Sequence, residues 1–128
     1  MAAIVLIHGA YQGGWIMQPT AKVLRAAGHT VYTPTLDGCA ERGHQLRPGI
    51  TTETHADEIA NLLYYEDITD AVLCGTSTGG MVMAKAAEMA RDRVGRGVFA
   101  DALALQDGER IGDFVDRKTA INTDLASG

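Results

Sequence analysis

The chain has 128 residues, 46% hydrophobic and 21% charged, with a net charge of −5 at pH 7, which indicates one domain able to bury a core. Its scattered basic residues argue against nucleic acid as a partner, because phosphate binding needs clustered Lys and Arg. We find no apolar run of membrane-spanning length, no signal peptide and no metal-ligand spacing around the two cysteines, so we expect a cytoplasmic protein without membrane, metal or cofactor partners.

Short apolar segments alternate with amphipathic ones along the chain. In order, the pattern predicts a strand over Ala3–Ile7, a helix over Pro19–Ala27, a strand over Thr30–Thr33, a loop over Leu36–Ile50, a helix over Thr52–Glu66, a strand over Ala71–Cys74, a helix over Ser77–Arg91 and a strand over Val98–Ala100. Such alternation favours right-handed βαβ crossovers. We therefore expect an α/β fold with a doubly wound, mostly parallel sheet and helices on both faces.

A G-x-S-x-G sequence, Gly75-Thr76-Ser77-Thr78-Gly79, stands between the third predicted strand and the helix after it. In a nucleophile elbow, this turn holds the serine in a strained backbone conformation that projects its hydroxyl above the sheet edge. Small residues two before and two after the serine let the strand and helix backbones nearly touch. The alternative is that Ser77 merely caps the helix. Because the flanking glycines and the strand–turn–helix context are those of an elbow, we interpret Ser77 as a nucleophile.

A glycine-rich loop directly follows the first predicted strand and begins His8-Gly9-Ala10. An acyl-transfer site needs two backbone N–H donors for the oxyanion. We expect one from Thr78, the residue after the serine, and one from Ala10 in this loop. Glycine at position 9 would let the loop backbone approach a substrate closely.

We expect the other side chains of this loop to line the substrate pocket or to support the fold. Tyr11 and Gln12 lie beside the expected oxyanion donor, so we expect them, with Gly9, to line the substrate pocket. We interpret His8 as a residue with structural hydrogen bonds and Trp15 as a core residue.

Taken together, these segments resemble the α/β-hydrolase superfamily, and within it the small-esterase branch that includes carbamate and aryl ester hydrolases, plant methyl esterases and hydroxynitrile lyases. The resemblance covers about the first hundred residues in uninterrupted order. The residues that carry it are Val5–Ala10, Leu24–His29, Thr33–Gly38, Glu41–His44, Val72–Gly80 and Val98–Ala102. It implies that Ser77 is the nucleophile and that Ala10 and Thr78 are the oxyanion donors. Esterases of this branch usually carry a trio such as His-Ser-Tyr where this chain has Thr76-Ser77-Thr78.

The triad of this superfamily runs Ser, then Asp or Glu, then His, and such domains commonly have about 200–250 residues. We therefore expect residues 1–128 to be the N-terminal part of one hydrolase domain, truncated after about four strands, with the cap starting near residues 106–128. The chain's histidines all precede Ser77. We expect His29 and His55 to lie away from the elbow, and His44 is the one conceivable base within the chain.

Asp101 follows the fourth predicted strand, where some relatives place the triad acid. Its alternative is a polar residue that ends the strand and packs beneath a cap.

We predict a serine hydrolase that acts on a small ester, amide or carbamate through an acyl-enzyme on Ser77, with its base supplied by a C-terminal half. The first alternative is a hydroxynitrile lyase-like enzyme on the same scaffold. The second is a catalytically inactive, truncated binding module. The fourth strand would leave an apolar sheet edge exposed, which indicates self-association as a further expectation.

Overall fold

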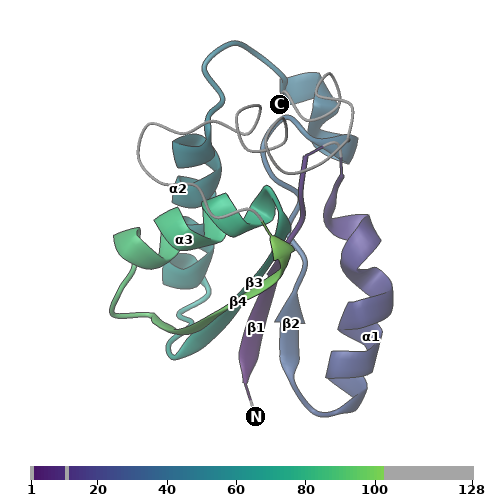
Figure 1. Ribbon diagram of the computed structural model, residues 1–128, viewed down its shortest axis with the longest axis vertical. Coiled ribbons are helices and arrows are strands. Elements are labelled where there is room, and N and C mark those ends of the chain that lie inside the picture. The colour runs from purple at the N-terminus through teal and green to yellow at the C-terminus, as the bar shows by residue number, and fades with distance from the viewer. Residues whose placement is uncertain (1, 11, 103–128) are drawn as a thin grey trace.

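The computed structural model describes residues 2–10 and 12–102, and over these residues the chain forms one four-stranded parallel sheet between two layers of helices (Figure 1). The strands lie in the order β2-β1-β3-β4, and their bounds are Ala3–Ile7 for β1, Thr30–Tyr32 for β2, Ala71–Ser77 for β3 and Val94–Ala102 for β4. Helix α1, Gln18–Ala26, covers one face, and helices α2, Thr52–Tyr65, and α3, Gly79–Met89, cover the other. The expected doubly wound α/β architecture is confirmed.

Strand β1 shows why the first apolar run has no polar alternation. Val5 and Ile7 pack into the core beneath α2 and α3, whereas Ile4 and Leu6 pack into the core beneath α1. All four side chains are buried. A strand covered on both faces must be apolar at every position, so continuous apolarity predicted its central place correctly.

Strands β3 and β4 are both longer than their sequence patterns predicted. Strand β3 continues past Gly75 to Ser77, and the following helix starts at Gly79 instead of Ser77, because Ser77 has a left-handed backbone conformation that no helix residue adopts. Strand β4 begins at Val94 and includes Gly95 and Gly97. Parallel pairing with β3 from Ala71 onward supplies the backbone hydrogen bonds that side-chain propensity could not reveal.

The segment between β2 and α2 was expected to be a plain loop and contains a short 3-10 helix instead. This helix, η2, spans Ala40–Gln45, and a second 3-10 helix, η1, spans Gly14–Met17 before α1. None of the described helices combines the length and the apolar character needed to cross a bilayer.

Within the described residues, β4 is an outer strand of the sheet. Its Val98 and Phe99 side chains are 40% and 50% exposed. An apolar strand at an edge is a site where further backbone can pair. Self-association through this edge stays a prediction.

Candidate active site

The backbone around Ser77 has the geometry expected of a nucleophile elbow. Ser77 ends β3 with a φ angle of 50°, in the left-handed region that a non-glycine residue adopts only under constraint. The following residue, Thr78, already has helical backbone angles and precedes α3 directly. The Ser77 side chain is exposed, so its hydroxyl stands at the carboxyl edge of the sheet and at the positive end of the helix.

Two glycines make this sharp turn sterically feasible. A Cβ atom at Gly75 would lie 2.5 Å from the Gly79 carbonyl oxygen, and one at Gly79 would lie 2.7 Å from the His8 carbonyl oxygen. Both distances are shorter than those that real Cβ atoms show, and both neighbours are backbone. The small residues on either side of Ser77 are therefore required by the close approach of β3, α3 and the end of β1.

The glycine-rich loop after β1 lies directly against the elbow. A Cβ atom at Gly9 would be 2.9 Å from the Ser77 Cβ atom, so a larger residue at position 9 would collide with the serine. The Gly9 N–H group donates a 2.8 Å hydrogen bond to Oε1 of Gln12, which folds the loop back on itself. The Ala10 N–H group donates a 2.8 Å hydrogen bond to the Thr78 hydroxyl. These contacts bring Gly9, Ala10, Ser77 and Thr78 together, as the sequence predicted.

His8 links this loop to the segment after β2. Its side chain is only 1% exposed, Nε2 accepts the Leu36 N–H at 2.9 Å, and Nδ1 donates to the Gly9 carbonyl at 2.8 Å. Because the Leu36 amide can only donate, the ring proton must be on Nδ1. Burial lowers the pKa of His8 from its usual value and keeps the ring neutral. Both nitrogens are used, so His8 has the structural role that we expected.

A cleft of about 500 Å³ opens beside the elbow. Its lining includes Gly9, Ala10 and Thr78, which we call the elbow wall, and Asp37, Arg47 and His55, which we call the side-chain wall. Apolar side chains such as Leu36 and Val82 also line it. Ser77 lies next to this lining and is not part of it. The volume is that of a small-molecule site.

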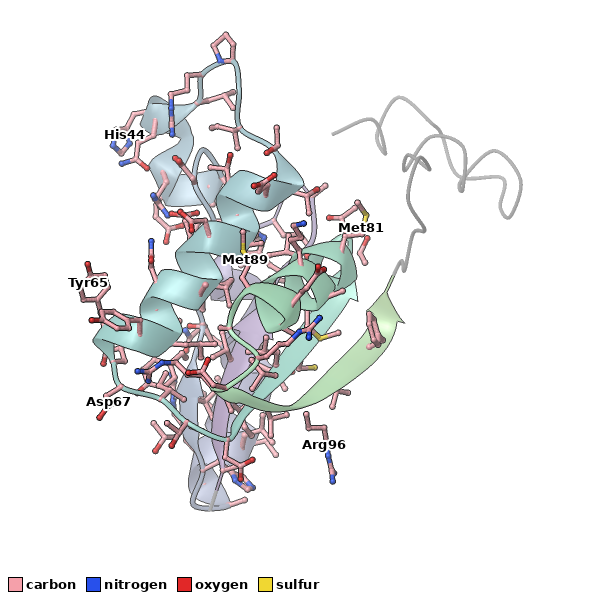
Figure 2. The ribbon with its side chains drawn as sticks, turned by 90° about the vertical axis from the view of Figure 1, so that its left-hand side faces the viewer. His44, Tyr65, Asp67, Met81, Met89 and Arg96 are labelled. Atoms are coloured by element: carbon pink, nitrogen blue, oxygen red, sulfur yellow. The ribbon has the colours of Figure 1, made fainter. Side chains whose placement is uncertain are left out.

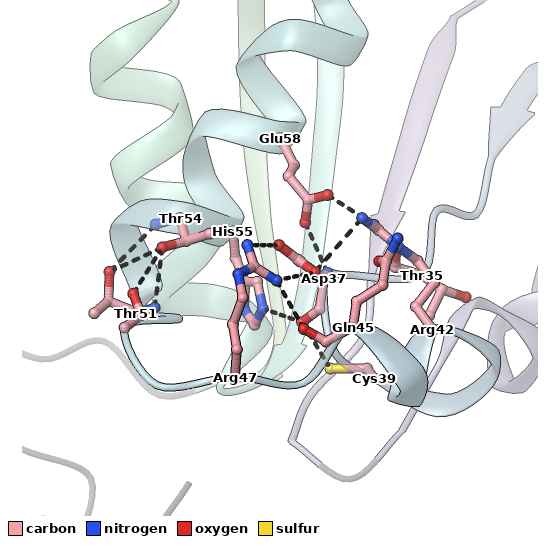
Figure 3. A network of polar contacts seen from close by, with 11 residues as sticks. Thr35, Asp37, Cys39, Arg42, Gln45, Arg47, Thr51, Thr54, His55 and Glu58 are labelled. Carbon is pink, nitrogen blue, oxygen red and sulfur yellow. Dashed lines mark hydrogen bonds and ion pairs between the residues drawn. The ribbon is translucent and has the colours of Figure 1, made fainter.

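The side-chain wall is held by a network of charged side chains that sequence reasoning missed (Figure 3). Asp37 is buried, and both of its carboxylate oxygens accept from Arg47, at 3.1 and 2.7 Å. Arg42 lies 3.7 Å from Asp37 and forms a 2.7 Å ion pair with Glu58 of α2. The Arg47 guanidinium lowers the pKa of Asp37, so this carboxylate stays ionised and paired at neutral pH.

Two further residues of this wall bear on its chemistry. His55 Nε2 bonds the Asp37 carbonyl oxygen at 2.9 Å, so His55 lines the same cleft as Ala10 and Thr78. We expected His55 to lie away from the elbow; it shares the cleft with Ala10 and Thr78, whereas Ser77 is not part of that lining. Burial raises the pKa of the Cys39 thiol, which makes Cys39 a poor nucleophile.

The other two histidines lie farther from the elbow. His29 accepts a 3.1 Å hydrogen bond from the Ala2 N–H, at the amino end of β1 and thus at the opposite edge of the sheet. His44 is exposed on η2, and Figure 2 shows it on the other side of the molecule from Met81 in the first turn of α3.

The structure corrects the prediction for Trp15 and does not describe the side chains of Tyr11 and Asp101. Trp15 was expected in the core and is 62% exposed, because Met17 of the same turn fills the core beneath α1. Tyr11 lies outside the described residues. Asp101 lies in β4 between Ala100, which pairs with Thr76, and Ala102, which pairs with Ser77, and its side chain is outside the described part of the structure.

Nothing in the described residues points to a metal ion, since no three His, Cys, Asp or Glu side chains gather closely enough to hold one. The chemistry available at this site is that of an exposed hydroxyl beside backbone N–H groups.

Comparison with known proteins agrees with this geometry. A model of the alpha/beta hydrolase family matches residues 4–126. The carbendazim hydrolyzing esterase of Nocardioides sp. is 38% identical over 111 residues, which are 87% of this chain and 46% of that protein. The alpha-hydroxynitrile lyase of Arabidopsis thaliana is 34% identical over 103 residues, which are 77% of this chain and 38% of the lyase. The chain thus spans less than half the length of these relatives.

A solved structure is similar over the same region. It is an extracellular alpha/beta-hydrolase from a Paenibacillus species, described as sharing structural and functional homology with tobacco salicylic acid binding protein 2. It superposes with a TM-score of 0.80 at 34% identity and covers 88% of this chain and 46% of the Paenibacillus chain.

Proposed function

The chain belongs to the alpha/beta hydrolase family, and from that premise we propose that its protein is a serine esterase that forms an acyl-enzyme on Ser77. The observation that carries the proposal is the left-handed Ser77 at the end of β3, with Gly9 packed against it and Thr78 beginning the next helix. A serine that only capped a helix would not need φ at 50°.

The reaction would proceed in two balanced stages. Ser77 Oγ attacks the substrate carbonyl carbon while a base takes the hydroxyl proton, and the carbonyl oxygen becomes an oxyanion that accepts from the Ala10 and Thr78 N–H groups. The base then protonates the leaving alcohol or amine as its bond to the carbonyl carbon breaks. Water, deprotonated by the same base, releases the acid from Ser77.

We propose that the base is a histidine from a C-terminal half of the protein. Within the chain, His8 has both ring nitrogens in structural hydrogen bonds, and His29 bonds the backbone at the far edge of the sheet. His55 bonds a carbonyl oxygen, and His44 faces solvent on η2. The relatives are more than twice as long as their matched region, which leaves ample chain for the base. Asp101 is the candidate acid, on the strand beside Ser77.

The substrate we propose is a small ester, amide or carbamate. The cleft beside the elbow has about 500 Å³ and an apolar lining that includes Leu36, Leu46, Ile50 and Val82, which suits a compact, largely apolar molecule. The similarity to a carbendazim hydrolyzing esterase supports the same class.

A second candidate is a hydroxynitrile lyase-like reaction, which the 34% identity to the Arabidopsis lyase favours. In that reaction the serine and its base move a proton and no acyl-enzyme forms. The two functions therefore differ in whether substrate carbon becomes bonded to Ser77.

Pre-steady-state hydrolysis of p-nitrophenyl acetate by the whole protein distinguishes the esterase from the lyase and from an inactive binding module. The esterase predicts a burst of p-nitrophenol close to one equivalent per active site, which Ser77→Ala abolishes. Thr76→Ala, a change of similar size on the other side of the serine, should keep the burst. Steady turnover of a cyanohydrin with no burst would favour the lyase, and neither activity would favour the binding module.

A further inference from the structure

Thr78 uses its side chain in an unusual way for a residue at the start of a helix. A threonine in this position ordinarily accepts a hydrogen bond from an N–H group of the first helical turn. Thr78 makes no such cap bond to α3, and its hydroxyl oxygen instead lies 2.8 Å from the Ala10 nitrogen and accepts that N–H. This hydroxyl therefore contacts the group expected to bind a substrate oxyanion.

The hydroxyl occupies one of the two N–H donors that an oxyanion would need, that of Ala10. An oxyanion must come within about 2.7–3.1 Å of both donors, the N–H groups of Ala10 and Thr78. The Thr78 hydroxyl satisfies this for Ala10, and it is attached to the Cβ of the residue that carries the second donor. A substrate carbonyl oxygen and this hydroxyl cannot both occupy the one N–H of Ala10 with good geometry.

We propose that the Thr78 hydroxyl is an internal occupant of the oxyanion site, and that the substrate carbonyl displaces it by rotation of the Thr78 side chain. The proposal rests on the proposed esterase function and adds a residue that tunes substrate affinity. The hydroxyl holds the Ala10 N–H in place while the site is empty, and it competes with the carbonyl once substrate enters. Its removal therefore strengthens substrate binding.

The kinetic consequence falls on KM. One neutral hydrogen bond has a net worth that corresponds to about a two- to tenfold change in an equilibrium constant. Because the hydroxyl is displaced when the carbonyl first binds, its loss should favour the Michaelis complex and the transition state equally. Thr78→Ala should lower KM for a small ester about two- to tenfold, whereas Thr76→Ala, which leaves the Ala10 contact in place, should keep the KM of the native protein.

The contact itself can be tested without any activity. Gly9-Ala10 is the one Gly-Ala pair in the 128 residues, so labelling glycine with carbonyl ¹³C and alanine with ¹⁵N gives Ala10 its own NMR signal in this chain. Thr78→Val keeps the side-chain volume and removes the acceptor. We expect amide hydrogen exchange at Ala10 to accelerate about two- to tenfold in Thr78→Val, and to be unchanged in Thr78→Ser.

Thr76→Val is the matched control, since it makes the same change two residues away and should leave Ala10 exchange unaltered. Equal exchange in the native chain and in Thr78→Val would overturn the proposal. A tenfold loss of kcat in Thr78→Ala would also overturn it. That loss is expected if the hydroxyl donates to the oxyanion, or if it only holds the loop in place. Ser77→Ala tests the two proposals independently. It should abolish ester hydrolysis, whereas amide exchange at Ala10 should stay slow.

Discussion

The two walls of the cleft are built in different ways. The elbow wall is made of backbone: a left-handed serine, glycines that allow close approach, and an Ala10 N–H group that the Thr78 hydroxyl accepts. The side-chain wall is held by a network in which Asp37, Arg47 and Glu58 meet from a loop and a helix. Backbone geometry of the first kind leaves a local sequence signature, whereas a network of the second kind has partners up to twenty-one residues apart. His8 joins the two walls through its two ring nitrogens.

The largest expected effect comes from a methyl group in the elbow wall. Gly79→Ala places a Cβ atom 2.7 Å from the His8 carbonyl oxygen, with backbone on both sides, so α3 must shift from β1. We expect a loss of about 3 kcal/mol in the free energy of unfolding, measured by urea denaturation. Gly43→Ala is the matched control, because nothing lies within 4 Å of a Cβ atom there. A Gly79→Ala protein as stable as this control would contradict the account of the elbow.

The next effect tests the bridge between the walls. His8→Phe fills a similar volume but leaves the buried Leu36 N–H and Gly9 carbonyl without partners. A buried group left unsatisfied costs about 1–3 kcal/mol, and two such groups at the lower end of that range give an expected loss of about 2 kcal/mol in urea unfolding. His44→Phe, at an exposed position, should change stability by less than about 0.5 kcal/mol. Equal values for the two variants would mean that His8 does not join the walls.

A smaller effect follows from the pKa of the same side chain. Burial lowers the folded-state pKa of His8 below its usual value of 6.5. As pH falls through 6.5, the unfolded chain binds a proton at His8 that the folded protein does not accept, so the free energy of unfolding decreases. Unfolding curves between pH 5 and 8 should show this decrease in the native protein, and His8→Asn should show less of it. A stability that rose toward pH 5 would have the wrong sign.

The smallest effect is expected in the side-chain wall. Arg47 is about half exposed, and its ion pair with Asp37 is open to solvent on one side. Arg47→Gln should lower the urea midpoint less than His8→Phe does, and the difference from the native protein should shrink in 1 M NaCl because salt screens exposed pairs. A difference that persisted in high salt would show that this wall is as rigid as the elbow.

The contrast between the walls also explains what the sequence could predict. Residues 75–79 and 8–10 carry their geometry in glycines at fixed spacing, and the structure brings them together as expected. The strand β1 was predictable because Ile4 and Val5 face opposite cores and both must be apolar. Each of these segments carries its signature within a few consecutive residues.

Four features of the structure were not predictable from the local sequence. The 3-10 helix η2 lacks a capping side-chain bond at Cys39, and Arg42 within it pairs with Glu58 of α2. Strand β4 contains Gly95 and Gly97 and is held by its pairing with β3. Trp15 was misplaced because hydrophobicity alone could not tell it from Met17, which turns inward. The charged residues around Asp37 showed no motif, although Thr33–Gly38 and Glu41–His44 already formed part of the family resemblance.

The central claim is that Ser77 is an activated nucleophile, and covalent labelling tests it most directly. A fluorophosphonate probe should add one equivalent to the whole protein, seen in the intact mass and assigned to the peptide that contains Ser77, and Ser77→Ala should abolish the adduct. Labelling of the 128-residue chain by itself would mean that a base within the chain, with His44 first to be tested, activates the serine. No adduct on the chain or on the whole protein would contradict the claim and leave a binding module on a hydrolase scaffold.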